Sequence, residues 1–195
     1  MPEGSVDALR SALADLTNWL DAARIPAMVI GGVAASVLGR PRFTRDIDAL
    51  VILPESDWQT ALEDAAKFGI VPRIGQALEF ARRSRVLLMR HAASGIDLDI
   101  ILGGLPFETS AVESSRPYDV GGVSVRLPRV EDLLVMKAIA RRPKDLEDIR
   151  GLLAAHPDAD TGAARQWIRE FATAASMPDM LEEFDQLLEQ SRSKS

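Results

Sequence analysis

The sequence IGGVAASVLGRPRFTRDID, residues 30–48, carries the pattern that decides the fold of this chain. It begins at the end of the apolar run 27–30 and continues with Gly31 and Gly32. A short apolar run predicts a buried strand. Glycines after a strand allow a left-handed turn and the close approach of another group to the backbone. We therefore predict a strand over 27–30 that turns directly into a short helix over 33–39.

The end of this stretch places two carboxylates, Asp46 and Asp48, before another apolar run. Because residues i and i+2 of a strand face the same side, a strand over 46–53 would project both carboxylates together. Two carboxylates on one face suit a shared cation, and Mg²⁺ is commonly held by carboxylates and substrate phosphates. The N–H groups of a helix that starts after Gly31-Gly32 would favour phosphate. The pattern therefore indicates a nucleotide and metal site, although glycine pairs and a lone D-x-D are each common without function.

Taken together, these residues resemble a known signature. Gly-Gly, thirteen intervening residues and Asp-Ile-Asp resemble the signature of the polymerase-β-type nucleotidyltransferase superfamily. The local form Arg42-x-Thr44-x-Asp46-Ile47-Asp48 resembles the branch of AbiEii-like and MenT-like toxin nucleotidyltransferases. The sequence LLVMKAIARRPKDLEDI at 133–149 resembles a second block of that branch.

The resemblance implies an α/β (α+β) fold, in which a small mixed β-sheet of the minimal nucleotidyltransferase fold is flanked by helices. The nucleotidyltransferase domain would cover 1–128, with a helix over 6–23 packed on it. A helical C-terminal part would cover 129–190, and 191–195 would form a disordered tail. The implied enzyme moves a nucleoside monophosphate from a nucleoside triphosphate to an acceptor and releases pyrophosphate, with two Mg²⁺ ions as cofactors.

The metal site needs a third carboxylate, and the strand predicted over 96–102 offers Asp97 and Asp99 on one face. Asp97 lies near the turn at Gly95, where a carboxylate is easily hydrated. Asp99 lies among apolar residues, where a bare charge is harder to tolerate. Asp99 is therefore the preferred third ligand. Asp97 remains the alternative, because strand register is not fixed by the sequence.

Lys137 lies among apolar residues of a helix predicted over 130–141. Two interpretations are open: a surface lysine whose charged end reaches solvent, or the catalytic residue that the resemblance implies. Arg42 and Thr44 are candidates, with Lys137, for binding phosphate or orienting the carboxylates. Lys144, Asp145 and Asp148 follow Pro143, where carboxylates favour the start of a helix. Helix capping and a surface ion pair are the interpretation of these residues without a functional role.

The remaining chain shows further helix and strand patterns. Residues 78–80 are predicted to begin a strand. Gly121-Gly122 between two apolar runs is a hairpin signal. Other predicted elements are a helix over 57–68, a strand at 70–71, a strand over 86–90 pairing antiparallel with 96–102, a helix from 106 to 114, strands over 118–120 and 123–127, a helix starting at 143 and two helices within 160–190.

Composition limits the function classes. The 195 residues contain no cysteine, which excludes a thiolate metal site and a cysteine nucleophile, and two histidines far apart, which disfavour a zinc site. No signal peptide and no membrane span is visible, so we expect no membrane partner and a cytoplasmic protein. The net charge is −6, but arginines cluster at 40, 42 and 45, at 82, 83 and 85, and at 141 and 142. These clusters favour an RNA acceptor, in particular tRNA.

The resemblance also implies a toxin of a toxin–antitoxin or abortive-infection system, with an antitoxin protein as partner. Two alternatives stay open. A small-molecule nucleotidyltransferase of the aminoglycoside type would need an acidic acceptor pocket. A toxin-derived binding protein with weak catalysis would lack metal-dependent nucleotide binding.

Overall fold

The computed structural model describes residues 3–192 and divides into two compact units. The sheet unit contains the chain up to residue 33 together with 43–127. The helical unit contains 34–42 and the chain from 128 onward. Residues 34–42 therefore group with the C-terminal helices and not with the sheet that precedes and follows them in sequence.

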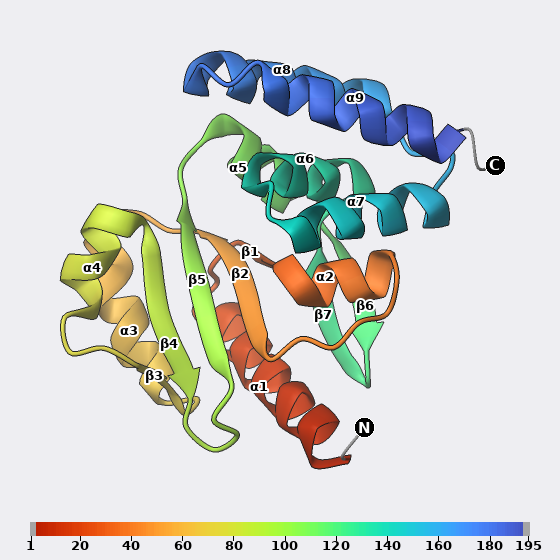
Figure 1. Ribbon diagram of the computed structural model, residues 1–195. Coiled ribbons are helices and arrows are strands. Elements are labelled where there is room, and N and C mark those ends of the chain that lie inside the picture. The colour runs from red at the N-terminus through yellow and green to blue at the C-terminus, as the bar shows by residue number, and fades with distance from the viewer. Residues whose placement is uncertain (1–2, 193–195) are drawn as a thin grey trace. The chain divides into compact units, whose positions relative to one another are not determined.

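The sheet unit is built on a five-stranded mixed sheet with strand order β1-β2-β5-β4-β3 (Figure 1). The central pair β2–β5 is parallel, and the other neighbouring pairs are antiparallel. This mixed sheet with flanking helices confirms the predicted α/β fold class. The strands are β1 (Ala27–Ile30), β2 (Asp46–Ile52), β3 (Ile70–Pro72), β4 (Val86–His91) and β5 (Asp97–Gly103).

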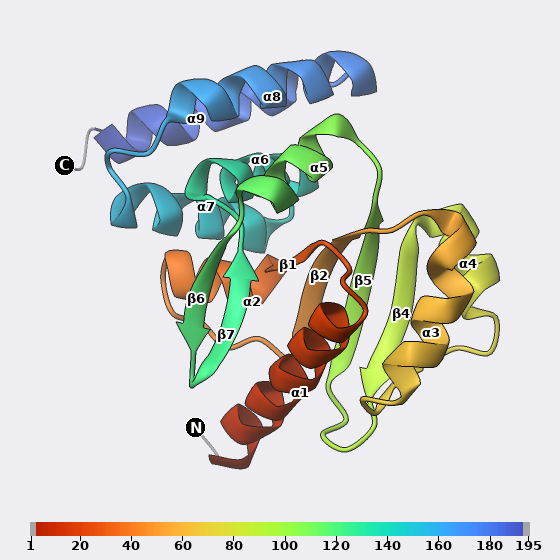
Figure 2. The ribbon, with the colours of Figure 1, turned by 180° about the vertical axis from the view of Figure 1, so that it is seen from behind.

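Helices α1 (Glu3–Ala22) and α3 (Trp58–Ala66) lie against one face of this sheet (Figure 2). Helix α1 starts earlier than the predicted residue 6, and Leu13, Leu16 and Trp19 are its buried stripe. A short 3₁₀ turn (Glu55–Asp57) precedes α3, and α5 (Pro106–Ser114) follows β5. The hairpin of β6 (Arg116–Val120) and β7 (Val123–Leu127) turns at two glycines with positive φ, as the sequence predicts.

Residues 78–80, predicted to begin a strand, lie instead in helix α4 (Ala77–Ser84). Three residues give too little periodicity to separate the two structures. The helix is supported by the pair of Glu79 and Arg83, which are four residues apart and therefore neighbours on a helical surface. It ends at Arg85, whose φ of 58° is left-handed.

The helical unit contains α6 (Val130–Ala140), α7 (Pro143–Ala155), α8 (Thr161–Ala175) and α9 (Asp179–Arg192). Leu133, Ile149 and Ile168 are fully buried in its core. Helix α2 (Gly31–Leu38) starts in the sheet unit and ends here, where the Leu38 carbonyl lies 2.6 Å from the His156 Nε2 atom. Of the predicted tail 191–195, the first two residues belong to α9 and 193–195 lie outside the described residues. Among the described helices, none combines the length and the apolar character that crossing a bilayer requires.

Candidate active site

Asp46 and Asp48 open strand β2, and their side chains share one face of the sheet. Their neighbours Ile47 and Ala49 face the opposite side and are completely buried. Asp46 is exposed and Asp48 is half-buried. The strand therefore anchors itself through its apolar face and presents the two carboxylates on the other, which is the arrangement that the sequence pattern predicts.

The parallel pairing of β2 with β5 sets Asp46 opposite Asp97 and Asp48 opposite Asp99. Because directly opposite residues of a parallel pair face the same side, the carboxylates of both strands gather on one face of the sheet. The backs of both strands are equally apolar, since Leu98 and Ile100 are buried beside Asp99. This register, which the sequence could not supply, brings the predicted pair and both candidate third acids together.

Gly31 makes room for Asp48. Strand β1 pairs Ile30 with Asp48, so the next residue lies directly against the Asp48 side chain. A Cβ atom at Gly31 would stand 1.8 Å from the Asp48 Oδ2 atom, and the φ of 62° is also one that glycine tolerates best. The close approach that the sequence predicted at Gly31-Gly32 is thus made by the carboxylate of Asp48. The phosphate contact predicted there stays a prediction, and Gly32 follows as the second residue of α2.

Thr44 holds the other carboxylate. Its hydroxyl donates to the Asp46 Oδ1 atom at 2.8 Å and lies 3.2 Å from the Asp46 carbonyl oxygen. This contact fixes the side chain of Asp46 relative to its own backbone. Of the two roles predicted for Thr44, the geometry matches the orientation of a carboxylate.

Two arginines that the sequence reasoning missed neutralise the β5 carboxylates. Arg73 lies 2.8 Å from the Asp97 Oδ2 atom through Nη1 and also pairs with Asp99 through Nη2. Arg90 donates to the Asp97 Oδ1 atom at 2.7 Å. Arg90 stands opposite Asp97 in the β4–β5 pair, so the predicted hairpin could have revealed it. Arg73 follows the short strand β3, in a region without a clear sequence pattern.

These contacts separate the two candidate third acids. The hydrogen bond from Arg90 lowers the pKa of Asp97 against the effect of burial, and Arg73 lowers it further. Burial raises the pKa of Asp99; Arg73 acts in the opposite direction, while the negative charges of Asp46 and Asp97 add to the increase. Asp97 is thus a carboxylate already satisfied by two cations, whereas Asp99 is under-compensated.

The carboxylates fit a hard cation in chemistry. Oxygen donors of this type are those that Mg²⁺ prefers, and a cation would relieve the repulsion that Asp99 feels from Asp46. As they lie, no three histidine, aspartate or glutamate side chains of the described chain are grouped closely enough to hold a metal ion. A cation on Asp99 would therefore compete with Arg73 for the carboxylate oxygens.

Lys137 lies in the helical unit and is buried, with 3% of its surface exposed. Its ammonium group donates to the Asp145 Oδ1 atom at 3.0 Å and to the Asp148 Oδ2 atom at 2.7 Å. The surface-lysine interpretation is therefore wrong, and so is the surface pair proposed for Asp145 and Asp148, which are both buried. Burial of the charge is tolerated because both partners are ionic and hydrogen-bonded.

Arg42 joins the same cluster. Its Nε and Nη2 atoms donate to the two oxygens of Asp148 at 2.8 and 3.0 Å, and its backbone N–H and C=O bond the Ser36 hydroxyl. Asp148 thus holds both Arg42 and Lys137. Arg42 and Lys137 are brought together in the helical unit, whereas the carboxylates, Gly31 and Thr44 are brought together in the sheet unit.

Comparison with protein families decides the identity. A family model described as "Nucleotidyl transferase AbiEii toxin, Type IV TA system" matches residues 12–194. The chain belongs to the AbiEii nucleotidyltransferase family. The polymerase-β-type superfamily and the AbiEii branch predicted from the sequence are confirmed, and the AbiEii-family chain is an enzyme of the nucleotidyltransferase class.

One solved structure supports the fold of this AbiEii-family chain. A solution structure of the antibiotic-resistance factor ANT(2″)-Ia is similar over 92% of this chain and 97% of its own, at 15% identity and a TM-score of 0.58. A crystal structure of an antigenic nucleotidyltransferase-like protein from Paracoccidioides brasiliensis covers 93% of this chain and 94% of its own, at 15% identity and a TM-score of 0.48. A search of curated proteins finds no match. At this identity the first likeness shows a shared fold alone.

Most of the clustered arginines of the AbiEii-family chain are already paired. Arg82 binds Glu55, Arg83 binds Glu79, Arg141 binds Asp179 and Glu183, and Arg142 binds Asp145. Arg85 donates to the Leu102 carbonyl. These residues therefore give a weaker positive surface than the sequence suggested.

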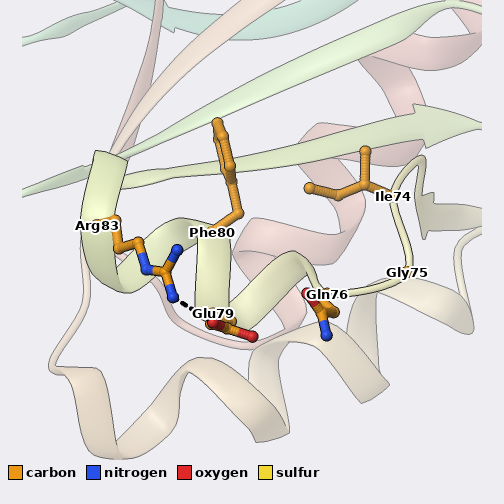
Figure 3. Close-up of a pocket in the computed structure, with 6 residues that line it drawn as sticks. All are labelled: Ile74, Gly75, Gln76, Glu79, Phe80 and Arg83. Atoms are coloured by element: carbon orange, nitrogen blue, oxygen red, sulfur yellow. Dashed lines mark hydrogen bonds and ion pairs between the residues drawn. The ribbon is translucent and has the colours of Figure 1, made fainter.

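The sheet unit also contains two adjoining hollows at the start of helix α4. One, of about 350 Å³, is lined by Ile74–Gln76, Glu79, Phe80 and Arg83 (Figure 3). The other, of about 470 Å³, is lined by Gln59, Glu63, Gln76 and Glu79 among apolar neighbours. Figure 3 shows the ion pair of Glu79 with Arg83. Ile74, which lines both hollows, directly follows Arg73 in the sequence.

Proposed function

We propose that this AbiEii-family enzyme transfers a nucleoside monophosphate from a nucleoside triphosphate to an RNA acceptor, releases pyrophosphate, and uses Mg²⁺ held by Asp46, Asp48 and Asp99. The observation that carries the proposal is the register of β2 with β5, which gathers these carboxylates on one face of the sheet. Asp99 is preferred over Asp97 because Asp97 is already bound by two arginines.

The chain's own residues would share the work as follows. Gly31 and Thr44 hold Asp48 and Asp46 in place, and the first N–H groups of α2, at Gly31 and Gly32, would receive phosphate oxygens. Bound Mg²⁺ supplies charge neutralisation on the triphosphate and activation of the acceptor oxygen.

Arg42 and Lys137 would act as positioning residues. Lys137 pairs with Asp148, and Asp148 in turn binds Arg42. Arg42 directly precedes the stretch 43–45, which leads into Asp46. A direct phosphate contact by Lys137 is disfavoured, because its ammonium group already has two buried carboxylate partners.

The biological setting is a second part of the proposal. The family description supports a toxin with an antitoxin protein as its partner. We propose tRNA as the acceptor and the cytoplasm as the compartment, where nucleoside triphosphates and tRNA occur together. Because most clustered arginines are paired, recognition of RNA would depend on a small local surface and not on a broad basic face.

One observation favours a second candidate function. The hollow of about 470 Å³ beside α4 is lined by Glu63 and Glu79 and by no basic side chain, although Glu79 also pairs with Arg83 of the adjoining hollow. An acidic pocket is what a cationic small-molecule acceptor would require, so an aminoglycoside-type acceptor is the alternative to RNA.

The test is incubation of the protein with Mg²⁺ and each α-³²P-labelled nucleoside triphosphate, in parallel with purified tRNA, total RNA or an aminoglycoside. Label in tRNA supports the proposal, and label in the aminoglycoside alone supports the alternative. Asp48→Asn should abolish labelling, whereas Asp57→Asn, at an exposed aspartate of the 3₁₀ turn, should leave it unchanged. No labelling together with no Mg²⁺-dependent nucleotide binding would indicate a toxin-derived binding protein.

A further inference from the structure

The segment Phe43–Asp46 presents an aromatic ring next to the carboxylates. Phe43 is 47% exposed, which makes it one of the most exposed large apolar side chains described. The Arg45 guanidinium lies over its ring, 5.8 Å from the centroid. A single exposed aromatic residue needs no explanation. Here, however, the ring already has a guanidinium within cation–π distance, and Phe43 precedes Asp46 by three residues.

Arg45 differs from the other arginines of the sheet unit that are described above. Arg73, Arg82, Arg83 and Arg90 each pair with a carboxylate, and Arg85 donates to the Leu102 carbonyl. Within the described part of the chain, no carboxylate lies within ion-pair distance of Arg45, and the Phe43 ring is its recorded partner. Its positive charge is therefore uncompensated and exposed, which suits the capture of a phosphate-bearing ligand.

Thr44 holds this pair next to Asp46 within the sheet unit. Thr44, between Phe43 and Arg45, is hydrogen-bonded to the Asp46 carboxylate and lies 3.2 Å from its carbonyl oxygen. A ligand stacked on Phe43 would thus lie three residues from the proposed metal ligand Asp46, on a segment that the Thr44–Asp46 hydrogen bond already orders, so less ordering would oppose binding.

We infer that Phe43 and Arg45 form a nucleobase-binding platform. The base stacks on the exposed part of the Phe43 ring, and the Arg45 guanidinium contacts the attached phosphate. Base–aromatic stacking tolerates any base, because every base has a π-face. The ligand is therefore a nucleotide, either the nucleoside triphosphate or a nucleotide of the RNA acceptor. This inference rests on the proposed function and adds the surface that recognises the base.

The experiment measures binding without transfer. One arm follows the fluorescence anisotropy of a labelled single-stranded 8-mer RNA and of an abasic 8-mer of the same length. The other arm titrates the non-hydrolysable α,β-methylene analogue of each nucleoside triphosphate, with Mg²⁺, in a calorimeter. The variants are Phe43→Ala, Phe43→Leu and Phe43→Trp, with Leu105→Ala as a control for the loss of exposed apolar surface. Thermal unfolding verifies that each variant is folded.

Phe43→Ala should weaken binding about 10-fold in one arm, in line with the usual contribution of one stacked base. Phe43→Trp should restore binding, and Phe43→Leu should not, because leucine keeps apolar bulk without a π-face. Arg45→Gln should lower the salt dependence of RNA binding by about one counterion. A loss in the RNA arm assigns the base to the acceptor, and a loss in the other arm assigns it to the nucleoside triphosphate.

The inference is overturned if Phe43→Ala binds as tightly as the wild type in both arms. It is also overturned if the wild type binds intact and abasic RNA equally and does not bind the nucleotide analogues. The two proposals fail separately. Transfer that proceeds normally in Phe43→Ala, with binding unchanged, refutes the platform alone. Base-dependent binding in a protein that transfers nothing refutes the proposed function alone.

Discussion

Gly31 and Asp48 are packed so closely that no side chain fits between them. A Cβ atom at Gly31 would stand 1.8 Å from the Asp48 Oδ2 atom and 2.8 Å from its Cβ atom. Strand pairing of Ile30 with Asp48 enforces this contact. The glycine pair and the aspartate pair are therefore a single structural unit, in which the first glycine sets the position of the second aspartate.

Gly31→Ala should reduce transfer at least 10-fold. The new methyl group must displace the Asp48 carboxylate or the β1–α2 turn, and alanine also carries a cost of about 1–2 kcal/mol in the left-handed region. Gly95→Ala is the matched control, because Gly95 has a φ of 72° but open space where its Cβ would be. Steady-state transfer and thermal unfolding of both variants separate the two effects. Equal activity of the two variants would show that Asp48 does not depend on Gly31.

Asp99→Asn should remove Mg²⁺-dependent nucleotide binding, and Asp97→Asn should retain most of it. The reason is that Asp97 is neutralised by Arg73 and Arg90, whereas Asp99 has Arg73 alone and senses the charge of Asp46. Calorimetric titration of the nucleotide analogue with and without Mg²⁺ measures the difference. Retention in Asp99→Asn with loss in Asp97→Asn would make Asp97 the ligand.

Lys137→Met should destabilise the protein by about 2–3 kcal/mol, since a hydrogen bond to a charged group contributes about 1.5–3 kcal/mol. A lysine among apolar residues is costly to bury unpaired, so the sequence alone predicts that its removal preserves or raises stability. The structure reverses this expectation, because the ammonium group bridges two buried carboxylates. Each carboxylate keeps an arginine partner, Arg142 or Arg42, which limits the loss.

Urea unfolding measures this effect, and Lys144→Met, at an exposed lysine of α7, provides the control with unchanged stability. If Lys137→Met were as stable as the wild type, the buried ion cluster would not contribute to folding. A fall in transfer larger than the fraction of unfolded protein explains would add evidence that the cluster positions Arg42.

The stabilisation by Asp145 should disappear in acid. Burial alone would raise the pKa of Asp145, but the hydrogen bonds from Arg142 and Lys137 outweigh it and lower the pKa below its usual value. The Asp145 carboxylate of the unfolded chain therefore binds a proton more readily than that of the folded chain. The contribution of Asp145 to folding stability is complete above the unfolded pKa of about 3.9 and is lost as the pH falls through the lower folded pKa.

Unfolding temperatures of the wild type and Asp145→Asn, measured from pH 7 to pH 3, check this linkage. The difference in unfolding temperature between the wild type and Asp145→Asn should be constant at neutral pH and should become smaller below about pH 4. A gap that stays constant across the whole range would show that Asp145 is not ionised in the folded protein.

The sequence by itself predicted most of the local elements and named the candidate carboxylates of the site. Period-two carboxylates before an apolar run predicted β2 with Asp46 and Asp48 on one face, and Gly121-Gly122 predicted the β6–β7 hairpin. These features depend on neighbours in the chain, through backbone geometry and alternation of side chains. The resemblance of the two blocks added the family, which the family model confirms.

Tertiary structure decided which charges meet. The register of β2 with β5 placed Asp48 opposite Asp99, and Arg73 reached both acids of β5 from a stretch without sequence pattern. Lys137 became a buried partner of Asp145 and Asp148, although its spacing suited a surface position equally well. Register and long-range ion pairs depend on how distant segments pack, and alternation within one strand or helix carries no information about its partner. The same holds for Gly31, whose close neighbour Asp48 is seventeen positions away in the sequence.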